Sequence, residues 1–266
     1  MDLNAVKAKL QALNKKTSKT TNLWKPEEGK QTIRILPYKF QPEMPFMELY
    51  FHYGIGKRSL LSPVTTGGTD PIVEFAQQLK STGDREDFMN SLKLTPKMRT
   101  YVPVLVRGKE KEGVKFWGFG KIVYQELLGY AEDPDYANFE DPMNGRDFTV
   151  DFTKGAIATD NKTVIRPKPN TSPISEDKEI IKLVGDQPNL LEDVFEMQSY
   201  EDLKTALYTY LNPEEEEDKH LASMGGSSTE TTTPTTPVAE SKPEANTKDV
   251  DKVEDVGAAF DNLFNN

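Results

Sequence analysis

Two runs of alternating residues, joined by a short charged segment, constrain the fold of this chain more than any other feature. The runs are MRTYVPVLVRG (98–108) and VKFWGFG (114–120), with KEKEG between them. Both are rich in β-branched and aromatic residues, which favour strands, and both end in glycine. Two strands this close in sequence form an antiparallel hairpin. The chain must therefore contain an antiparallel sheet.

The alternation also assigns the side chains of this hairpin to faces, because successive side chains of a strand point to opposite sides. In the first run, Val102, Val104 and Val106 share one face, while Tyr101 and the cations share the other. In the second run, Val114, Phe116 and Gly118 share one face, and Lys115, Trp117 and Phe119 share the other. We expect one valine face that packs into a core and one basic, aromatic face. The latter would consist of Lys97, Arg99 and Tyr101 with Lys115, Trp117 and Phe119.

Further strands and helices surround the hairpin. Strand-like composition recurs at residues 31–37, 46–55, 147–153 and 162–166. Helical patterns with capping residues cover 71–79, 84–93, 122–131 and 199–211, and Ser199 and Asp202 have the spacing of a capping box. The sequence thus predicts a mainly β, α+β fold with peripheral helices.

Charge and cysteine content exclude several classes of protein. The net charge of −10 is unevenly spread, since Lys and Arg prevail in residues 1–120 and Asp and Glu in residues 121–266. A basic front half can bind a polyanion. The absence of cysteine excludes disulfides, thiolate zinc sites and cysteine nucleophiles. With no apolar run that resembles a signal peptide or a membrane span, we expect a cytoplasmic protein.

The two ends of the chain differ from the middle in composition. Near the amino terminus, a short amphipathic helix precedes KKTSKTT (15–21), which is either a solvated linker or an arm that touches phosphates or a neighbouring molecule. Residues 212–248 have too few apolar side chains to offset the entropy of ordering, so we expect a disordered, acidic linker. The last segment, 249–266, regains Phe260, Leu263 and Phe264 among acidic residues, which is typical of a docking tip.

Known catalytic and phosphate-binding motifs do not account for the chain. The segment Gly54–Ser59 lacks the spacing of a Walker loop, and Gly118–Phe119–Gly120 fails the dinucleotide pattern. The first of the two histidines, His52, lies in a strand pattern and is interpreted as a packed or exposed strand residue rather than a metal ligand. No constellation suits acid–base or nucleophilic catalysis, so we expect a protein that is not an enzyme.

Aromatic side chains next to Lys and Arg are the feature of this sequence that indicates a function. Aromatic side chains that stack on bases, next to cations that meet phosphates, are what a protein needs to bind single strands without sequence preference. The plain alternative is a basic hairpin that happens to carry exposed aromatic residues.

Three blocks resemble a known family in order and spacing. They are NLWKPEEGKQTIRILP (22–37), PFMELYFHYGI (45–55) and TYVPVLVRGKEKEGVKFWGFGKIVYQELLGY (100–130). Together they resemble the single-stranded DNA-binding, helix-destabilising proteins of T4-like bacteriophages, over roughly residues 3–166. The resemblance implies a protein of the infected host's cytoplasm that coats single-stranded DNA in phage replication, recombination and repair.

The resemblance also implies a domain plan and site residues. An amino-terminal segment (1–21) would support cooperative binding to neighbouring protomers, through Lys15, Lys16, Thr17 and Ser18. A core with an OB-fold (22–211) would bind DNA through Arg34, Lys57, Arg58, Lys97, Arg99, Tyr101, Lys115, Phe116, Trp117, Phe119 and Lys121. After a linker (212–248), a tip (249–266) would dock replication and recombination proteins through Asp255, Phe260, Asp261, Leu263 and Phe264.

Two departures from the family pattern matter. The family prototype holds zinc with one histidine and three cysteines, whereas here only His52 remains, so we predict no metal or other cofactor. Apolar packing through Ile72, Val73 and Phe75 would hold that subdomain instead. The basic, hydroxyl-rich cluster follows the first helix rather than preceding it, which puts the form of cooperativity in question. Alternatives to the coat protein are an adaptor that acts through the acidic tip and an RNA-binding relative.

Overall fold

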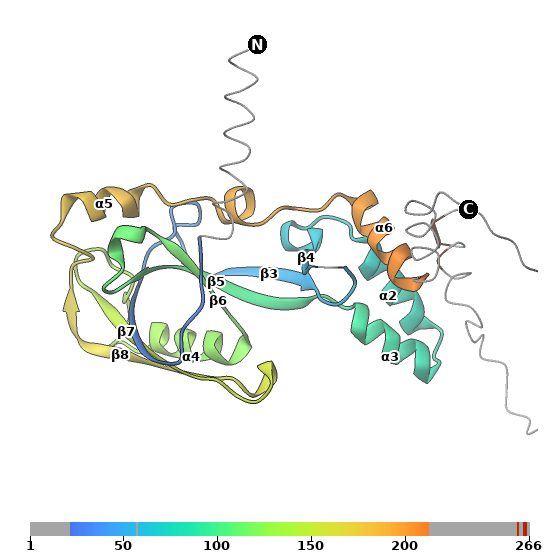
Figure 1. Ribbon diagram of the computed structural model, residues 1–266, viewed down its shortest axis with the longest axis horizontal. Coiled ribbons are helices and arrows are strands. Elements are labelled where there is room, and N and C mark those ends of the chain that lie inside the picture. The colour runs from blue at the N-terminus through green and yellow to red at the C-terminus, as the bar shows by residue number, and fades with distance from the viewer. Residues whose placement is uncertain (1–21, 57, 213–259, 261–262, 265–266) are drawn as a thin grey trace, which may run out of the picture. The chain divides into compact units, whose positions relative to one another are not determined.

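The structure is a computed structural model, and it describes residues 22–56, 58–212, 260, 263 and 264 (Figure 1). The described residues form two compact units. The sheet unit comprises those up to Phe51, Leu61–Gly68 and Lys97–Gln198. The helical unit comprises those within His52–Leu60, Thr69–Pro96 and from Ser199 onward. The amino-terminal arm and most of the tail lie outside the described residues, and with them Lys15, Lys16, Thr17, Ser18, Asp255 and Asp261 of the predicted sites.

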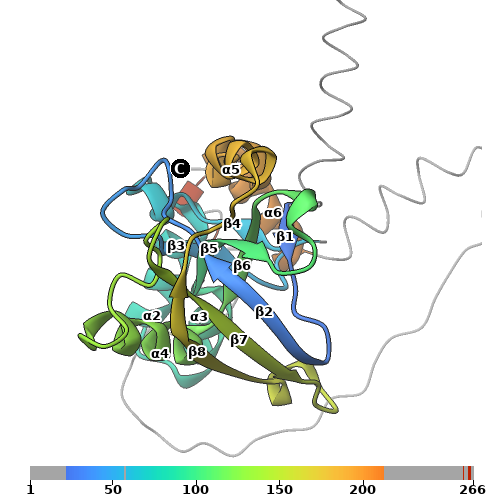
Figure 2. The ribbon, with the colours of Figure 1, turned by 90° about the vertical axis from the view of Figure 1, so that its left-hand side faces the viewer.

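Strands dominate the sheet unit. They are β1 (Leu23–Trp24), β2 (Gly29–Ile35), β3 (Met47–His52), β4 (Leu60–Leu61), β5 (Lys97–Val106), β6 (Lys115–Phe119), β7 (Gly145–Thr153) and β8 (Lys162–Ser172). Within the described residues they form one eight-stranded sheet in the order β1-β6-β5-β2-β7-β8, with β3 on β5 and β4 on β3. Figure 2 shows β2, β7 and β8 side by side. The pairs β2–β7 and β7–β8 are antiparallel. The predicted α+β class is confirmed.

The hairpin is present, but its register differs from the expectation. Val102 lies opposite Trp117 and Tyr101 lies opposite Gly118 in the β5–β6 pair. Because directly opposed residues point to the same side of a sheet, Trp117 shares the valine face. The predicted face that combined Lys97, Arg99 and Tyr101 with Lys115, Trp117 and Phe119 is therefore wrong. The alternation along each strand holds, and the error lies in how the two strands align.

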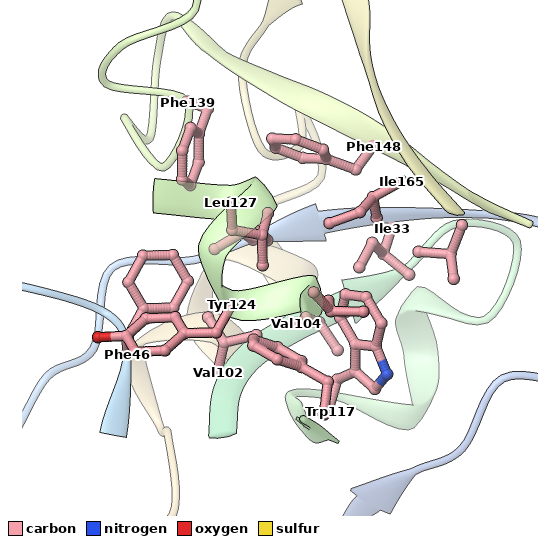
Figure 3. Close-up of a cluster of buried hydrophobic side chains, with 14 of the residues drawn as sticks. Ile33, Phe46, Val102, Val104, Trp117, Tyr124, Leu127, Phe139, Phe148 and Ile165 are labelled. Atoms are coloured by element: carbon pink, nitrogen blue, oxygen red, sulfur yellow. The ribbon is translucent and has the colours of Figure 1, made fainter. Parts of the chain in front are cut away.

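The valine face packs against helix α4 (Lys121–Glu132) and forms the main core. In Figure 3, Leu127 and Tyr124 of α4 lie over Val102, Val104 and Trp117. The rest of this buried cluster is Ile33, Ile35, Phe46, Val106, Phe119, Val123, Phe139, Phe148, Val150 and Ile165. Side chains from five strands and one helix thus form a single core on this face of the sheet.

The opposite face is covered by the chain that follows β8. Helix α5 (Lys178–Gly185) packs on the cluster of Leu36, Leu105, Val114 and Ile174. A π-helical turn, Leu190–Val194, contributes to a third cluster, with Tyr38, Met47, Leu49, Phe51, Leu61 and Phe116. Short 3-10 turns occur at Pro63–Thr66, Glu110–Glu112 and Ala158–Asp160. Both faces are therefore buried at β6 and along the second half of β5, whereas most residues of β8 are exposed.

The described part of the helical unit contains the helices α2 (Pro71–Ser81), α3 (Arg85–Leu94) and α6 (Tyr200–Leu211). Asp70 and Asp84 cap α2 and α3, and the predicted capping box of α6 is present. The core consists of Ile55, Ile72, Phe75, Ala76, Leu79, Leu94, Leu203, Leu207 and Phe260. Ile72 and Phe75 are fully buried, as the sequence predicts, and Val73 is partly exposed. No helix in the described part of the chain could span a membrane.

Candidate nucleic-acid interface

The predicted stacking rings of β6 are inside the protein. Trp117 is 2% exposed and Phe119 is 4% exposed, and both belong to the main core. Phe116 is fully buried on the other face, where its ring meets Tyr38 edge to face at 5.8 Å. The expectation that these rings line a surface is wrong, because both faces of β6 are covered. To stack on a base, each ring would first have to leave its core.

Tyr101 is the predicted ring that remains partly exposed. It lies over Gly118, where a Cβ atom would come within 2.5 Å of the tyrosine Cε1. Phe195 closes the other side, with the two ring centroids 4.9 Å apart. Arg99 is also partly exposed, and its Nη2 donates to the Gly118 carbonyl at 3.0 Å. With the exposed Lys97, these residues keep part of the predicted basic, aromatic face at the start of β5.

Arg34 does not reach the surface. Its side chain is fully buried, and its guanidinium donates to Asp147 Oδ1 (3.3 Å), to the Asp141 carbonyl (3.1 Å) and to Ser172. Burial lowers the pKa of Arg34, and the neighbouring Asp147 carboxylate opposes that shift. The expectation that Arg34 contacts a phosphate is therefore wrong, because the side chain is buried and Nη1 and Nη2 donate to internal acceptors.

The other predicted cations are spread over the two units. Lys115 is 8% exposed, and its Nζ lies 3.7 Å from Glu112 Oε2. Lys121 is exposed at the start of α4, and Arg58 is exposed in the helical unit. Lys57 lies outside the described residues. Of the predicted cations that the structure describes in the sheet unit, Lys97, Arg99 and Lys121 are accessible to a phosphate.

A cavity of about 450 Å³ forms a second candidate site, which the sequence analysis missed. It lies where β1, β2 and the end of β5 meet, and its lining includes Trp24, Lys30, Arg107 and Lys109. The Trp24 side chain is partly exposed and meets Trp117 edge to face at 5.6 Å. The signal in the sequence was Trp24 itself, which precedes two lysines, Lys25 and Lys30, in the segment LWKPEEGK.

The cations of this cavity differ in whether they form ion pairs. The Arg107 guanidinium is bound to Asp147 (2.8 Å) and to the Ile174 carbonyl (2.7 Å). Lys109 Nζ lies 3.2 Å from Glu27 Oε1, in an exposed pair of the kind that contributes little and is readily exchanged. Lys30 is exposed and forms no ion pair with a described residue. Lys30 is therefore available to bind an anion in this cavity. Lys109 can bind the anion if the anion replaces Glu27 as its partner.

This combination suits a nucleotide. An indole ring offers a stacking surface for a base, and ammonium groups beside it can bind the phosphate. The volume falls in the range of small-molecule sites. His52 packs inside the helical unit, and no cluster of three or more His, Cys, Asp or Glu side chains that could hold a metal occurs among the described residues.

Comparison with known proteins adds an independent finding. A family model described as "gp32 DNA binding protein like" matches residues 27–210. This span includes Lys30, Arg107 and Lys109 of the cavity and the whole β5–β6 hairpin. No curated protein matches the chain.

Proposed function

The chain belongs to the gp32-like family of DNA-binding proteins, and from that premise we propose that it binds single-stranded DNA without sequence preference. Membership confirms the resemblance carried by residues 22–37, 45–55 and 100–130. A coat protein of single strands needs stacking surfaces and cations on a stable scaffold, with no catalytic group.

The observation that carries the proposal is the partly exposed Trp24 in a cavity with Lys30 and Lys109. We propose that a base stacks on Trp24 and that the flanking phosphates bind the two lysines. Arg107 shapes the wall, since its charge is already paired with Asp147. A base stacked on an aromatic ring is worth about 1–3 kcal/mol, and every phosphate contact adds salt dependence.

The DNA strand that extends beyond this cavity needs a second surface to bind to. The cluster of Lys97, Arg99 and Tyr101 supplies cations and one partly exposed ring, so it is the proposed continuation. Lys121 and Arg58 are accessible for further phosphates. This assignment retains the accessible part of the site predicted from the sequence.

The biological role that follows is that of a non-enzymatic coat on single-stranded DNA. We propose that the protein acts in phage replication, recombination and repair in the host cytoplasm. Neighbouring protomers would interact cooperatively through residues 1–21, which include Lys15, Lys16, Thr17 and Ser18. The tip, 249–266, would dock replication and recombination proteins, with Asp255 and Asp261 supplying negative charge.

Titration of the full chain with oligo-dT at two salt concentrations tests the proposal. We expect quenching of tryptophan fluorescence and an affinity that falls steeply with salt. The same titration with oligo-rU distinguishes an RNA-binding relative, which would prefer the ribose strand. If no oligonucleotide binds at low salt while a protein still binds the tail, the chain is an adaptor and the proposal fails.

A further inference from the structure

Two described residues of the C-terminal tip, Phe260 and Phe264, pack against the protein's own helical unit. Phe260 is 2% exposed and belongs to the same buried cluster as Leu203 and Leu207. The centroid of its ring lies 5.5 Å from that of Tyr208 on α6 and 6.2 Å from that of Phe75 on α2. A residue that follows the end of α6 by roughly 50 positions thus completes the core of this unit.

Phe264 makes the second contact, one helical turn later. Its ring lies 4.8 Å from the ring of Phe260, and Lys204 Nζ is 5.4 Å from its centroid. The same ammonium group donates to the Phe264 carbonyl at 3.0 Å, and both phenylalanines have helical backbone. Leu263 between them is 40% exposed. One side of the turn therefore binds the unit, and the other side faces solvent.

The surface that receives the tip is formed jointly by two helices, here called the α2–α6 face. Its described contacts to the tip come from Phe75, Tyr200, Lys204 and Tyr208. Tyr200 also donates from its hydroxyl to Glu74 Oε2 at 2.7 Å, which ties the start of α6 to α2. The two helices of the α2–α6 face are therefore joined by a hydrogen bond that does not involve the tip.

We propose that the α2–α6 face is a binding site for a short helix with aromatic residues four positions apart, and that the chain's own tip is its ligand. A partner protein that recognises Phe260 must then displace the tip from this face. Because the tip is covalently attached, its effective concentration at the face is high, which favours the bound form without requiring a strong contact. Phe260, predicted from the sequence as a partner-docking residue, is thus withheld until a partner competes for it.

This inference does not depend on DNA binding, and a peptide of residues 249–266 with a fluorescent label tests it. The peptide is added to the full-length chain, either wild type or Phe260→Ala, and anisotropy is recorded. The wild-type tip competes with the peptide, whereas the substituted tip does not. We expect the Phe260→Ala chain to bind the peptide roughly tenfold or more tightly than wild type. Leu263→Ala, at an exposed position of the same turn, should behave as wild type.

Two further variants locate the site. On the Phe260→Ala background, Tyr208→Ala should weaken peptide binding at least about tenfold, since the Tyr208 ring contacts Phe260 in the native chain. Tyr210→Ala, at a position 38% exposed on the same helix, should leave peptide binding unchanged. Equal peptide affinity for wild type and Phe260→Ala, or no binding to either, overturns the proposal. Self-association of the wild type that Phe260→Ala abolishes would mean that the tip binds another copy, and would overturn the intramolecular assignment.

Discussion

His52 Nε2 lies 2.9 Å from Asp70 Oδ2, and both side chains are buried. The other ring nitrogen, Nδ1, lies 2.8 Å from the Leu94 carbonyl. Both ring nitrogens thus lie within hydrogen-bonding distance of buried oxygen atoms, which fixes the orientation of the imidazole. Asp70 Oδ1 also caps α2, so this one network joins the end of β3, the start of α2 and the end of α3.

Removal of the imidazole should destabilise the helical unit strongly. His52→Ala leaves Asp70 Oδ2 facing a buried cavity, and loss of one partner of a buried pair costs about 3–5 kcal/mol. Asp70→Asn should cost much less, because a carboxamide can still cap α2 and can donate to a neutral imidazole. Urea unfolding followed by circular dichroism measures both. Asp84→Asn, at the cap of α3, is the control, and a His52→Ala cost equal to that of this control would contradict the prediction.

The two glycines that flank Phe119 should respond differently to alanine. A Cβ at Gly118 would lie 2.5 Å from Tyr101 Cε1, and Phe51 and Phe195 limit how far that ring can move. We expect Gly118→Ala to cost about 1–3 kcal/mol of unfolding free energy. A Cβ at Gly120 meets nothing within 4 Å, so Gly120→Ala should cost less than about 1 kcal/mol. Equal costs in urea unfolding would argue against the placement of Tyr101 over Gly118.

Local signals in the sequence predicted most of the elements. Asp70 before Pro71 and the Ser199–Asp202 pair predicted the starts of α2 and α6, and the alternating runs predicted β5 and β6. These features depend on residues a few positions apart, so the sequence displays them directly. Helix α5 was missed, because it is short and its apolar side chains reach only the edge of a core cluster.

The site was predicted less well, because it depends on contacts between residues distant in the sequence. The register that turns Trp117 inward is set by the turn around Glu110–Glu112, which alternation along each strand does not reveal. Arg34 is buried by Asp147, more than a hundred residues further along the chain. Phe116 is covered by the segment around Leu190, which follows every strand. Local pattern shows which residues share a strand face but not what covers that face.

Alkaline pH should weaken the contact between α4 and β3. Burial, together with a 2.9 Å hydrogen bond to Glu48 Oε1, raises the pKa of Tyr124 from 10.0 to about 12. The folded state thus favours the neutral phenol. Its contribution to stability is complete below pH 10 and is lost as the pH rises through about 12.

Tyr124→Phe tests this pH dependence. At pH 7 it should cost about 1–2 kcal/mol, because Glu48 loses its donor. It should also reduce the fall in stability between pH 10 and pH 12 relative to wild type. Urea unfolding at pH 7 and pH 11 measures both effects, with Tyr210→Phe, at an exposed position, as control. An identical alkaline loss in wild type and Tyr124→Phe would exclude Tyr124 as its source.

Trp24, rather than Trp117, should report the binding of oligo-dT. Trp24 is partly exposed in the cavity, whereas Trp117 is 2% exposed in the core. We expect Trp24→Phe to abolish most of the fluorescence quenching with little loss of affinity, since phenylalanine can still stack. Trp24→Ala should weaken binding by about 1–3 kcal/mol. If Trp117→Phe abolishes the quenching instead, the core opens on binding and the cavity is not the site.

Lys30 should contribute one phosphate contact, which the salt dependence of binding can count. For single strands, the slope of log affinity against log salt is about −0.7 for each phosphate neutralised. Lys30→Gln should therefore make the slope shallower by about 0.7 and weaken binding equally for oligo-dT and oligo-dA, because a phosphate contact carries no sequence information. Lys80→Gln, an exposed cation at the end of α2, should leave the slope unchanged. If the slope is unchanged for Lys30→Gln but shallower for Arg99→Gln, the prediction is wrong. The phosphate contact would then lie at the start of β5 and not in the cavity.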